Sequence, residues 1–321
     1  MKILNDIICN NFIELAVTRT ANYLIENNLS GISLGISGGI DSSVVALIGL
    51  KAIDELKKSN KKIGYEFMFL DCDSDPFDYK RAKILAKKFN FELKYLNLNN
   101  WYWESPLHKL IPQNHPRRKY AEGNIKCRLR MISLYNSTQL HNYVYLDTDD
   151  LSEEYMGFWT RHGDEGDVKI IQHLTKTEVY DLGKYMGIPT IIINSQPGDG
   201  LKVTSANTAV DQLGLNYIYI EYIISRFIGE KFDFNGKLEQ LNDHKYKKLI
   251  TCVSQEITIP EENVIKVLNQ SLKTAYKRKY GDSVVHLLPE RREFGLFDIG
   301  TGDFNQKYLD VIRSLSRNNV I

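Results

Sequence analysis

The sequence lacks several features that would each narrow its function class. No apolar run approaches the roughly 20 residues that span a bilayer, so no membrane-spanning helix is expected. Residues 1–28 carry apolar side chains at helical spacing, without the basic start and compact apolar centre of a signal peptide. The 41 lysines and arginines are balanced by 40 acidic residues, which gives no general attraction to nucleic acid. We therefore expect a cytoplasmic protein that binds neither membrane nor nucleic acid.

The sequence is also poor in cysteine, with four in 321 residues. They are far apart and form no CxxC pair, so neither a zinc site nor a disulfide framework is predicted. Reduced, mostly buried thiols are the expectation. Hydrophobic residues make up 43% of the chain and charged residues 25%, which is ordinary for a globular protein with a large core.

Short apolar segments alternate with helical patterns through the first half of the chain. Strands are predicted at 31–36, 65–70, 91–98 and 143–146. Helices are predicted at 1–28, 41–58, 76–88, 128–140 and 175–186. Such alternation predicts an α/β fold with a doubly wound parallel sheet flanked by helices. Residues 99–122 are expected to be irregular, the chain beyond 207 to be mostly helical to about residue 279, and the last forty residues remain unassigned.

Three polar turns follow predicted strands, beginning at Ser37, Asp71 and Thr148. In a parallel sheet, ligands bind beyond the carboxyl ends of the strands. The three turns are therefore expected to converge on one crevice. The segment 194–207 is rich in Gly, Ser, Pro and Asn, and we expect a mobile loop or lid there.

The most informative motif is SGGIDSS at 37–43, between a predicted strand and a predicted helix. Its two glycines allow backbone amides to approach an anion, and the start of the helix adds its positive dipole end. Asp41 suits a phosphate site when a cation such as Mg²⁺ lies between them. The motif has neither the spacing and lysine of a Walker loop nor the GxGxxG pattern. It resembles the SGGxDSS signature of the ATP pyrophosphatase group, which implies ATP as a cosubstrate that is cleaved between its α and β phosphates.

Five further stretches resemble NAD synthetases of the ammonia-dependent type. They are GNIKCRLRM at 123–131, DTDDLSE at 147–153, GFWTRHGD at 157–164, LTKT at 174–177 and LGLNY at 213–217. The resemblance covers residues 1–280 as one domain, with 281–321 as a C-terminal extension of unknown role. It implies a Rossmann-like ATP pyrophosphatase (HUP-type) fold with a helical C-terminal part.

The resemblance also implies a role for individual residues. The expected ATP contacts are Ser37, Gly38, Gly39, Asp41, Ser42, Ser43, Thr148 and Lys176. The expected contacts to the dinucleotide substrate are Tyr120, Asn124, Arg128, Phe158, Asp164 and Asp167. Asp41 and Glu153 would hold Mg²⁺, and Asp41, Lys176 and Asp164 would take part in catalysis.

Several of these residues also have a plain structural interpretation. Arg128 and Arg130 fit the solvated face of a helix, and Phe158 fits an ordinary core aromatic. Asp164 fits the start of a turn, and Lys176 fits a surface lysine in the first turn of a helix.

The implied reaction is the amidation of nicotinic acid adenine dinucleotide to NAD through an acyl adenylate. Ammonia supplies the nitrogen, AMP and pyrophosphate are released, and the resemblance implies a homodimer. The turn at 71–75 is acidic where the family has an arginine and a glutamine, and Asp147 stands where it has a glycine. These departures leave open a paralogue that amidates another carboxylate, such as a nucleotide sugar or a secondary metabolite. A tRNA thiolase and an inactive nucleotide-binding protein are further alternatives.

Overall fold

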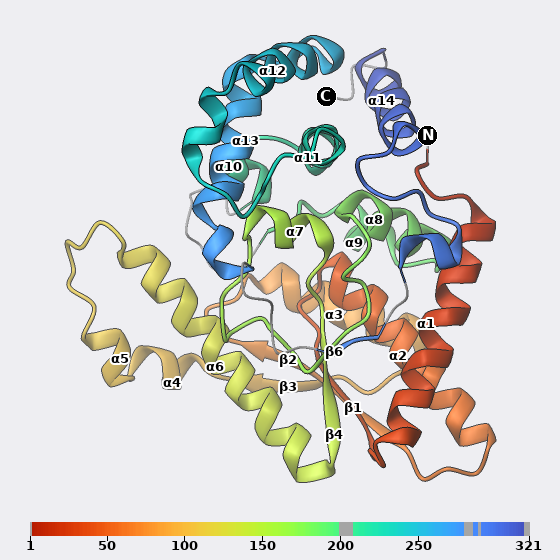
Figure 1. Cartoon of the computed structure of the whole chain (residues 1–321). Helices are drawn as coiled ribbons and strands as arrows, with labels where there is room; N and C mark the ends of the chain where they lie inside the picture. The colour runs from red at the N-terminus through yellow and green to blue at the C-terminus, as the bar shows by residue number, and fades with distance from the viewer. Residues whose placement is uncertain (1, 199–207, 279–284, 288–289, 318–321) are drawn as a thin grey trace.

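A six-stranded parallel sheet forms the centre of the protein (Figure 1). The computed structural model describes residues 2–198, 208–278, 285–287 and 290–317. The strands are β1 (Gly31–Gly35), β2 (Gly64–Asp71), β3 (Lys94–Asn97), β4 (Tyr143–Asp147), β5 (Val168–Lys169) and β6 (Val285–His286). They pair in the order β3-β2-β1-β4-β5-β6, with every pair parallel. The prediction of a doubly wound parallel sheet is confirmed.

The central strands are buried on both faces, as their apolar sequences require. Ile32 and Leu34 of β1 are fully buried, and β1 pairs with β2 on one side and β4 on the other. The chain winds outward in opposite directions from β1 and β4, so the sheet has a topological switch point between them. Such a point leaves a crevice beyond the carboxyl ends of its strands.

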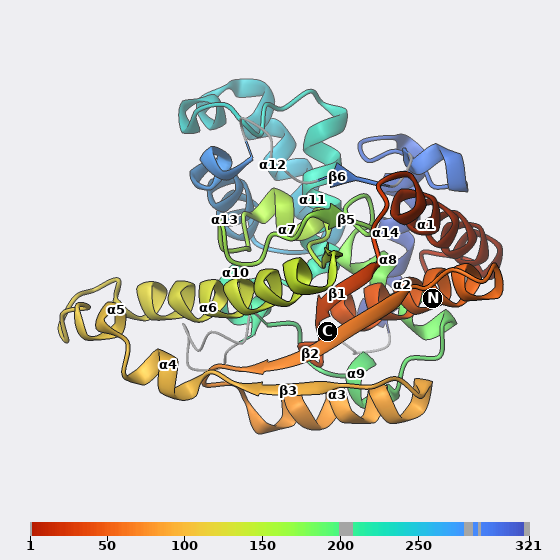
Figure 2. The ribbon, with the colours of Figure 1, turned by 90° about the horizontal axis from the view of Figure 1, so that it is seen from below.

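Helices cover both faces of the sheet (Figure 2). The main ones are α1 (Asp6–Glu26), α2 (Ile40–Lys58), α3 (Pro76–Phe89), α6 (Arg118–His141) and α8 (Lys176–Tyr185). Helix α2 packs against β1 and β2 with α1 and α8 beside it, and the larger hydrophobic core lies there. Helix α6 packs on the opposite face against β1, β2 and β4, over a smaller core that includes Leu70, Leu134 and Tyr145.

The chain after β4 adds further helices, which lie above the sheet in Figure 1. The helices are α7 (Leu151–Met156), α9 (Thr190–Ile193), α10 (Ala209–Leu213), α11 (Tyr217–Gly229), α12 (His244–Ile257), α13 (Glu261–Lys273) and α14 (Gly302–Arg317). Strand β6 pairs with β5 at the edge of the sheet, and α14 packs against α11. Residues beyond 281 therefore contribute both to the sheet, through β6, and to the helices above it, through α14.

The segment 99–122, which was expected to be irregular, contains two short helices and the start of α6. The helices are α4 (Asn99–Trp103) and α5 (Pro106–Lys109). Pro106 stands in the first turn of α5, where its missing N–H breaks no hydrogen bond. The expectation of an irregular segment is therefore wrong for these helices. Helix α6 also begins ten residues earlier than the predicted residue 128.

Other local predictions agree with the structure. Asp75 caps α3 by accepting a hydrogen bond from the Phe77 amide at 2.8 Å, with Pro76 in the first turn. The four cysteines are free thiols, of which all but Cys252 are buried. Among the described residues no helix has the length and apolar character to cross a membrane. The predicted lid at 194–207 lies mostly outside the described residues, since 199–207 are not described.

Candidate active site

The turn between β1 and α2 forms a small polar cradle. The Ser37 hydroxyl lies 3.0 Å from the Ser42 hydroxyl and accepts a hydrogen bond from the Gly39 amide at 3.2 Å. The Ser43 hydroxyl donates to the Gly39 carbonyl at 2.6 Å. Gly38 has a φ of +83°, and a Cβ there would lie 2.3 Å from the backbone oxygen of Asp78. Only glycine fits at this position, because both the dihedral and the close approach exclude a side chain.

The N-terminus of α2 opens into this cradle. Gly39 is the N-cap residue and provides no side-chain hydrogen bond to the first turn. The first amides of a helix that lack a capping side chain remain available to a ligand. Together with the dipole of this 19-residue helix, they favour an anion such as phosphate.

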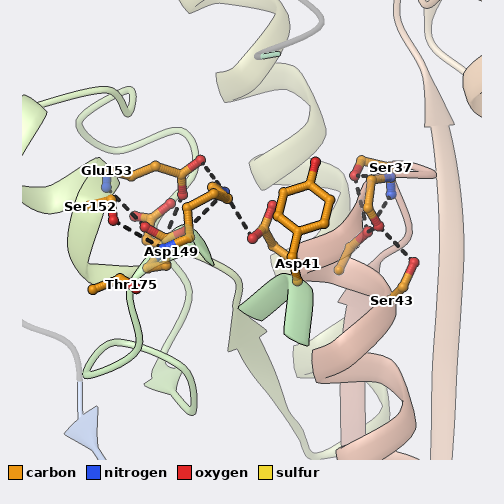
Figure 3. Close-up of polar contacts among 12 residues, drawn as sticks. Ser37, Asp41, Ser43, Asp149, Ser152, Glu153 and Thr175 are labelled. Atoms are coloured by element: carbon orange, nitrogen blue, oxygen red, sulfur yellow. Dashed lines mark hydrogen bonds and ion pairs between the residues drawn. The ribbon is translucent and has the colours of Figure 1, made fainter. Parts of the chain in front are cut away.

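Lys176, the first residue of α8, lies at the centre of a buried cluster of charges. Its ammonium is 2.8 Å from one carboxylate oxygen each of Asp41, Asp150 and Glu153. Asp41 and Glu153 approach this cluster from opposite sides in Figure 3, Asp41 from α2 and Glu153 from α7. Lys176 is 1% exposed, which excludes its interpretation as a surface lysine. Its ammonium also lies 5.5 Å from the ring centre of Tyr217.

Electrostatics keep this lysine charged. Burial alone lowers the pKa of Lys176, but the carboxylates of Asp150, Asp41 and Glu153 raise it well above its ordinary value. Burial raises the pKa of Asp150 and that of Glu153, although Lys176 opposes the rise in both. One ammonium thus faces three carboxylates, and the cluster has an excess of negative charge that a further cation would offset.

The oxygens of this cluster suit a magnesium ion that substrate phosphates help to bind. Asp41 and Glu153 border both cavities described below. Mg²⁺ is commonly held by one or two carboxylates together with phosphate oxygens and water. Within the described part of the chain, no group of three or more His, Cys, Asp or Glu side chains has the geometry to hold a metal by itself.

Two cavities meet at Asp41 and Glu153. The first has a volume of about 210 Å³ and lies between the carboxyl ends of β1, β2 and β4. Among the predicted site residues, it is lined by Ser37, Asp41, Ser42, Thr148, Glu153, Phe158 and Asp164. The second has a volume of about 310 Å³ and is lined by Ser37, Gly39 and Lys176, together with residues 195–198 at the start of the predicted lid. The turn between β1 and α2 therefore lies between the two cavities.

Two acidic side chains, those of Asp149 and Asp164, line the first cavity. Asp164 accepts a hydrogen bond from the Thr160 amide at 2.6 Å, and Asp149 lies 4.0 Å from Lys169. Burial raises the pKa of Asp164, and it raises the pKa of Asp149 well above its usual range. Both the turn-forming interpretation of Asp164 and its predicted place in the site agree with this geometry.

The remaining predicted substrate residues lie outside the cavities. Tyr120 is more than half exposed, and Arg128 donates to the Arg161 carbonyl at 3.2 Å. Asn124 accepts a hydrogen bond from the Thr160 hydroxyl at 2.9 Å. Both oxygens of Asp167 are engaged inside the protein, by the Tyr135 hydroxyl at 2.9 Å and the backbone amide of Tyr145 at 3.0 Å. A single chain therefore does not bring these four residues into the site.

Sequence reasoning missed two residues that the structure places in it. Asp150 is the third carboxylate at Lys176 and forms a capping box with Glu153. The D-x-x-E spacing at 150–153 is the signal for this box. Arg130 lines the first cavity and donates to the backbone oxygens of Leu70 and Cys72 and to the Ser74 hydroxyl. It thereby ties α6 to the acidic turn that follows β2, instead of lying on a solvated face.

Comparison with known proteins identifies the family of this chain. The NAD synthase family model matches residues 12–281. The NH(3)-dependent NAD(+) synthetase of Carboxydothermus hydrogenoformans is 35% identical over 225 residues, which are 68% of this chain and 88% of that protein. The corresponding protein of Syntrophomonas wolfei is 37% identical over 190 residues, 58% of this chain and 72% of that protein.

Solved structures show the same fold at lower identity. The NH3-dependent NAD synthetase from Campylobacter jejuni is 21% identical with a TM-score of 0.58, over 84% of this chain and 96% of that one. The NMN synthetase from Francisella tularensis is 21% identical with a TM-score of 0.62, over 84% and 94%. From the family match and the identity to curated relatives, the chain belongs to the NAD synthase family.

Proposed function

We propose that this protein is an ammonia-dependent NAD synthetase. It converts nicotinic acid adenine dinucleotide to NAD with ATP and ammonia, and releases AMP and pyrophosphate. One observation carries the proposal: in a chain of this family, Lys176 of α8 joins the phosphate-loop residue Asp41 to Glu153 of α7 at the switch point of the sheet. Relatives that are 35–37% identical are named for this activity, and they do not favour a different carboxylate substrate.

The reaction proceeds in two steps. In the first, a carboxylate oxygen of the substrate attacks the α phosphorus of ATP, and pyrophosphate leaves with the electron pair of the bond that breaks. In the second, ammonia attacks the carbonyl carbon of the acyl adenylate, AMP leaves, and the nitrogen loses a proton. The side chains need only position the reactants and offset charge, so no protein nucleophile is required.

The described residues provide for both tasks. The uncapped N-terminus of α2 and the hydroxyls of Ser37, Ser42 and Ser43 would hold the departing pyrophosphate. The ammonium of Lys176 would offset charge that develops on the phosphates. Thr148 lines the first cavity, where the AMP portion would lie.

Asp41 and Glu153 would hold Mg²⁺ with the phosphates of ATP. The ion would neutralise phosphate charge and lower the cost of bringing a carboxylate to a triphosphate.

We further propose that the protein acts as a homodimer. The arm, defined here as residues 99–122, lies at the left edge of the protein in Figure 1 and carries apolar side chains that are 51–76% exposed. These side chains are Trp101, Trp103, Leu107, Leu110 and Tyr120. Exposed aromatic and aliphatic side chains gathered in one segment are typical of an interface. A second copy packed there would also cover Tyr120, which a single chain leaves outside the site.

The dimer is tested by measuring the mass of the protein in solution by light scattering. Leu110→Glu should give a monomer that keeps its fold, whereas the wild type should have a mass near twice that of one chain. A wild-type monomer would contradict this part of the proposal.

The activity is tested by adding ATP, Mg²⁺, ammonium and nicotinic acid adenine dinucleotide to the purified protein. NAD and AMP should form in equal amounts, and Asp41→Ala should abolish both while leaving the fold intact by circular dichroism. Nicotinic acid mononucleotide serves as the comparison substrate, since it has the same carboxylate without the AMP half. Faster amidation of the mononucleotide would overturn the proposed substrate.

A further inference from the structure

The first turn of α8, which carries Lys176, is fixed by residues far from it in the sequence. Thr175 and Glu178 form a capping box around the helix start. Arg291 then binds Glu178 with both arms of its guanidinium, at 2.8 and 2.6 Å. Glu178 is fully buried and Arg291 is 6% exposed. A bidentate ion pair of this kind fixes direction as well as distance.

A second contact comes from α14. The Tyr308 hydroxyl lies 2.6 Å from the Thr175 hydroxyl, and both residues are buried. The Tyr308 ring stacks on Phe304 with ring centres 4.2 Å apart, and the Arg291 guanidinium lies over Phe304 at 5.4 Å. The two contacts to the start of α8 therefore belong to one packed unit formed by the C-terminal segment.

The other side of the same turn is bound by residues of α7 and α11. The backbone amide of Lys176 donates to the Ser152 hydroxyl at 3.0 Å, and the amide of Thr177 donates to Glu221 at 3.1 Å. The side chain of Lys176 is buried along its length, so the position of its backbone determines where the ammonium lies between the three carboxylates. The contacts that fix the first turn of α8 therefore also fix the position of the Lys176 ammonium among the three carboxylates.

We propose that Arg291 and Tyr308 are positioning residues for Lys176, and that this is a role of the C-terminal segment. Both lie beyond residues 12–281, which the family pattern covers. They touch the capping box and not the two cavities, so they act through α8. The effect on turnover rests on the proposed function, whereas the effect on the order of α8 does not.

The test uses the double variant Arg291→Met/Glu178→Gln in the full chain. It removes both charges of the ion pair, which avoids leaving one buried carboxylate without a partner. Glutamine still completes the capping box. Tyr308→Phe removes only the hydroxyl and keeps the stacked ring. The control is Arg292→Met, which alters the neighbouring arginine, whose side chain is 74% exposed.

We expect kcat of the double variant to fall about 10- to 100-fold, since a displacement of about 1 Å costs on that order. The KM for nicotinic acid adenine dinucleotide should change less than about twofold, because the variant leaves substrate contacts in place. Tyr308→Phe should show a smaller loss of kcat, and Arg292→Met none. Arg291→Lys, which keeps a positive charge beside Glu178, should retain more of the wild-type kcat than the double variant does.

Hydrogen exchange provides a readout that does not need the reaction. The amides of residues 176–178 should exchange faster in the double variant than in Arg292→Met, while those of α2 stay protected. Equal protection in the two variants, or equal kcat with both folded, would overturn the proposal. If the wild type makes no NAD, the proposed function fails and hydrogen exchange alone decides the positioning role. If the double variant does not fold, Tyr308→Phe decides by the same two measurements.

Discussion

Replacing Lys176 by methionine would keep an apolar stem in place and remove the ammonium that three carboxylates share at 2.8 Å. The side chains of Lys176 and Asp150 are 1% and 0% exposed, so this ion pair is buried. Removing one partner from a buried ion pair costs about 3–5 kcal/mol. We therefore expect Lys176→Met to lower the free energy of unfolding by about that amount at pH 8, where the acids are least protonated.

The loss should shrink as the pH falls. Burial already raises the pKa of Asp150 and of Glu153 in the fold, and removing the ammonium raises both further. An acid whose pKa is higher in the fold than in the unfolded chain favours the fold at low pH. That contribution is lost as the pH rises through the folded pKa. The loss of stability caused by Lys176→Met is therefore largest at pH values above the folded pKa values of Asp150 and Glu153.

Urea unfolding followed by tryptophan fluorescence at pH 5 and pH 8 measures this penalty. The matched control is Lys184→Met on the same helix, where the lysine is 47% exposed and pairs with Asp181 at 3.4 Å. Because the lysine of this pair is exposed to solvent, we expect the pair to contribute at most about 1 kcal/mol. Equal stability of Lys176→Met and wild type at pH 8 would refute the reasoning.

Three further substitutions test other parts of the site. Gly38→Ala should weaken ATP binding and lower the melting temperature, because its φ of +83° and the backbone oxygen of Asp78 exclude a side chain; an unchanged thermal melt would contradict this. Burial raises the pKa of Glu221 to about 7, so the stabilisation from its neutral form is lost as the pH rises from about 4.5 to 7. Glu221→Gln should therefore be more stable than wild type by roughly 3 kcal/mol at pH 8 and by little at pH 5, because each unit of pKa shift corresponds to about 1.4 kcal/mol. If urea unfolding gives the same pH dependence of stability for both proteins, this prediction is wrong. Arg130→Met should weaken ATP binding about tenfold in calorimetry, because Arg130 lines the first cavity and donates a hydrogen bond to Ser74. A hydrogen bond to a charged group is worth about 1.5–3 kcal/mol. Unchanged affinity would show that ATP binding does not depend on Arg130.

Patterns among neighbouring residues predicted the sheet and the ends of several helices. The alternation of apolar strands with helices predicted the sheet, and Asp75-Pro76 predicted the start of α3. The glycine-rich SGGIDSS motif predicted the polar turn at the start of α2, because few sequences fit a tight turn directly before a helix. In each case neighbouring residues determine the structure.

Long-range contacts explain what the sequence did not predict. Asp150 meets Lys176 across 26 positions of sequence, and only the fold brings them together. Arg291 meets Glu178 over a separation of 113 residues. Neither has a local periodicity that would reveal its partner. Helix α6 was predicted too short, because Gly123 interrupts the helical pattern, although the residues before it favour a helix.

The most direct test of the proposed chemistry follows one oxygen atom. The protein is given ATP, Mg²⁺, ammonium and nicotinic acid adenine dinucleotide labelled with ¹⁸O in its carboxylate, and the products are weighed by mass spectrometry. If the carboxylate attacks the α phosphorus, AMP carries one ¹⁸O and NAD keeps the other. Unlabelled AMP, or the release of ADP in place of AMP, would contradict the account.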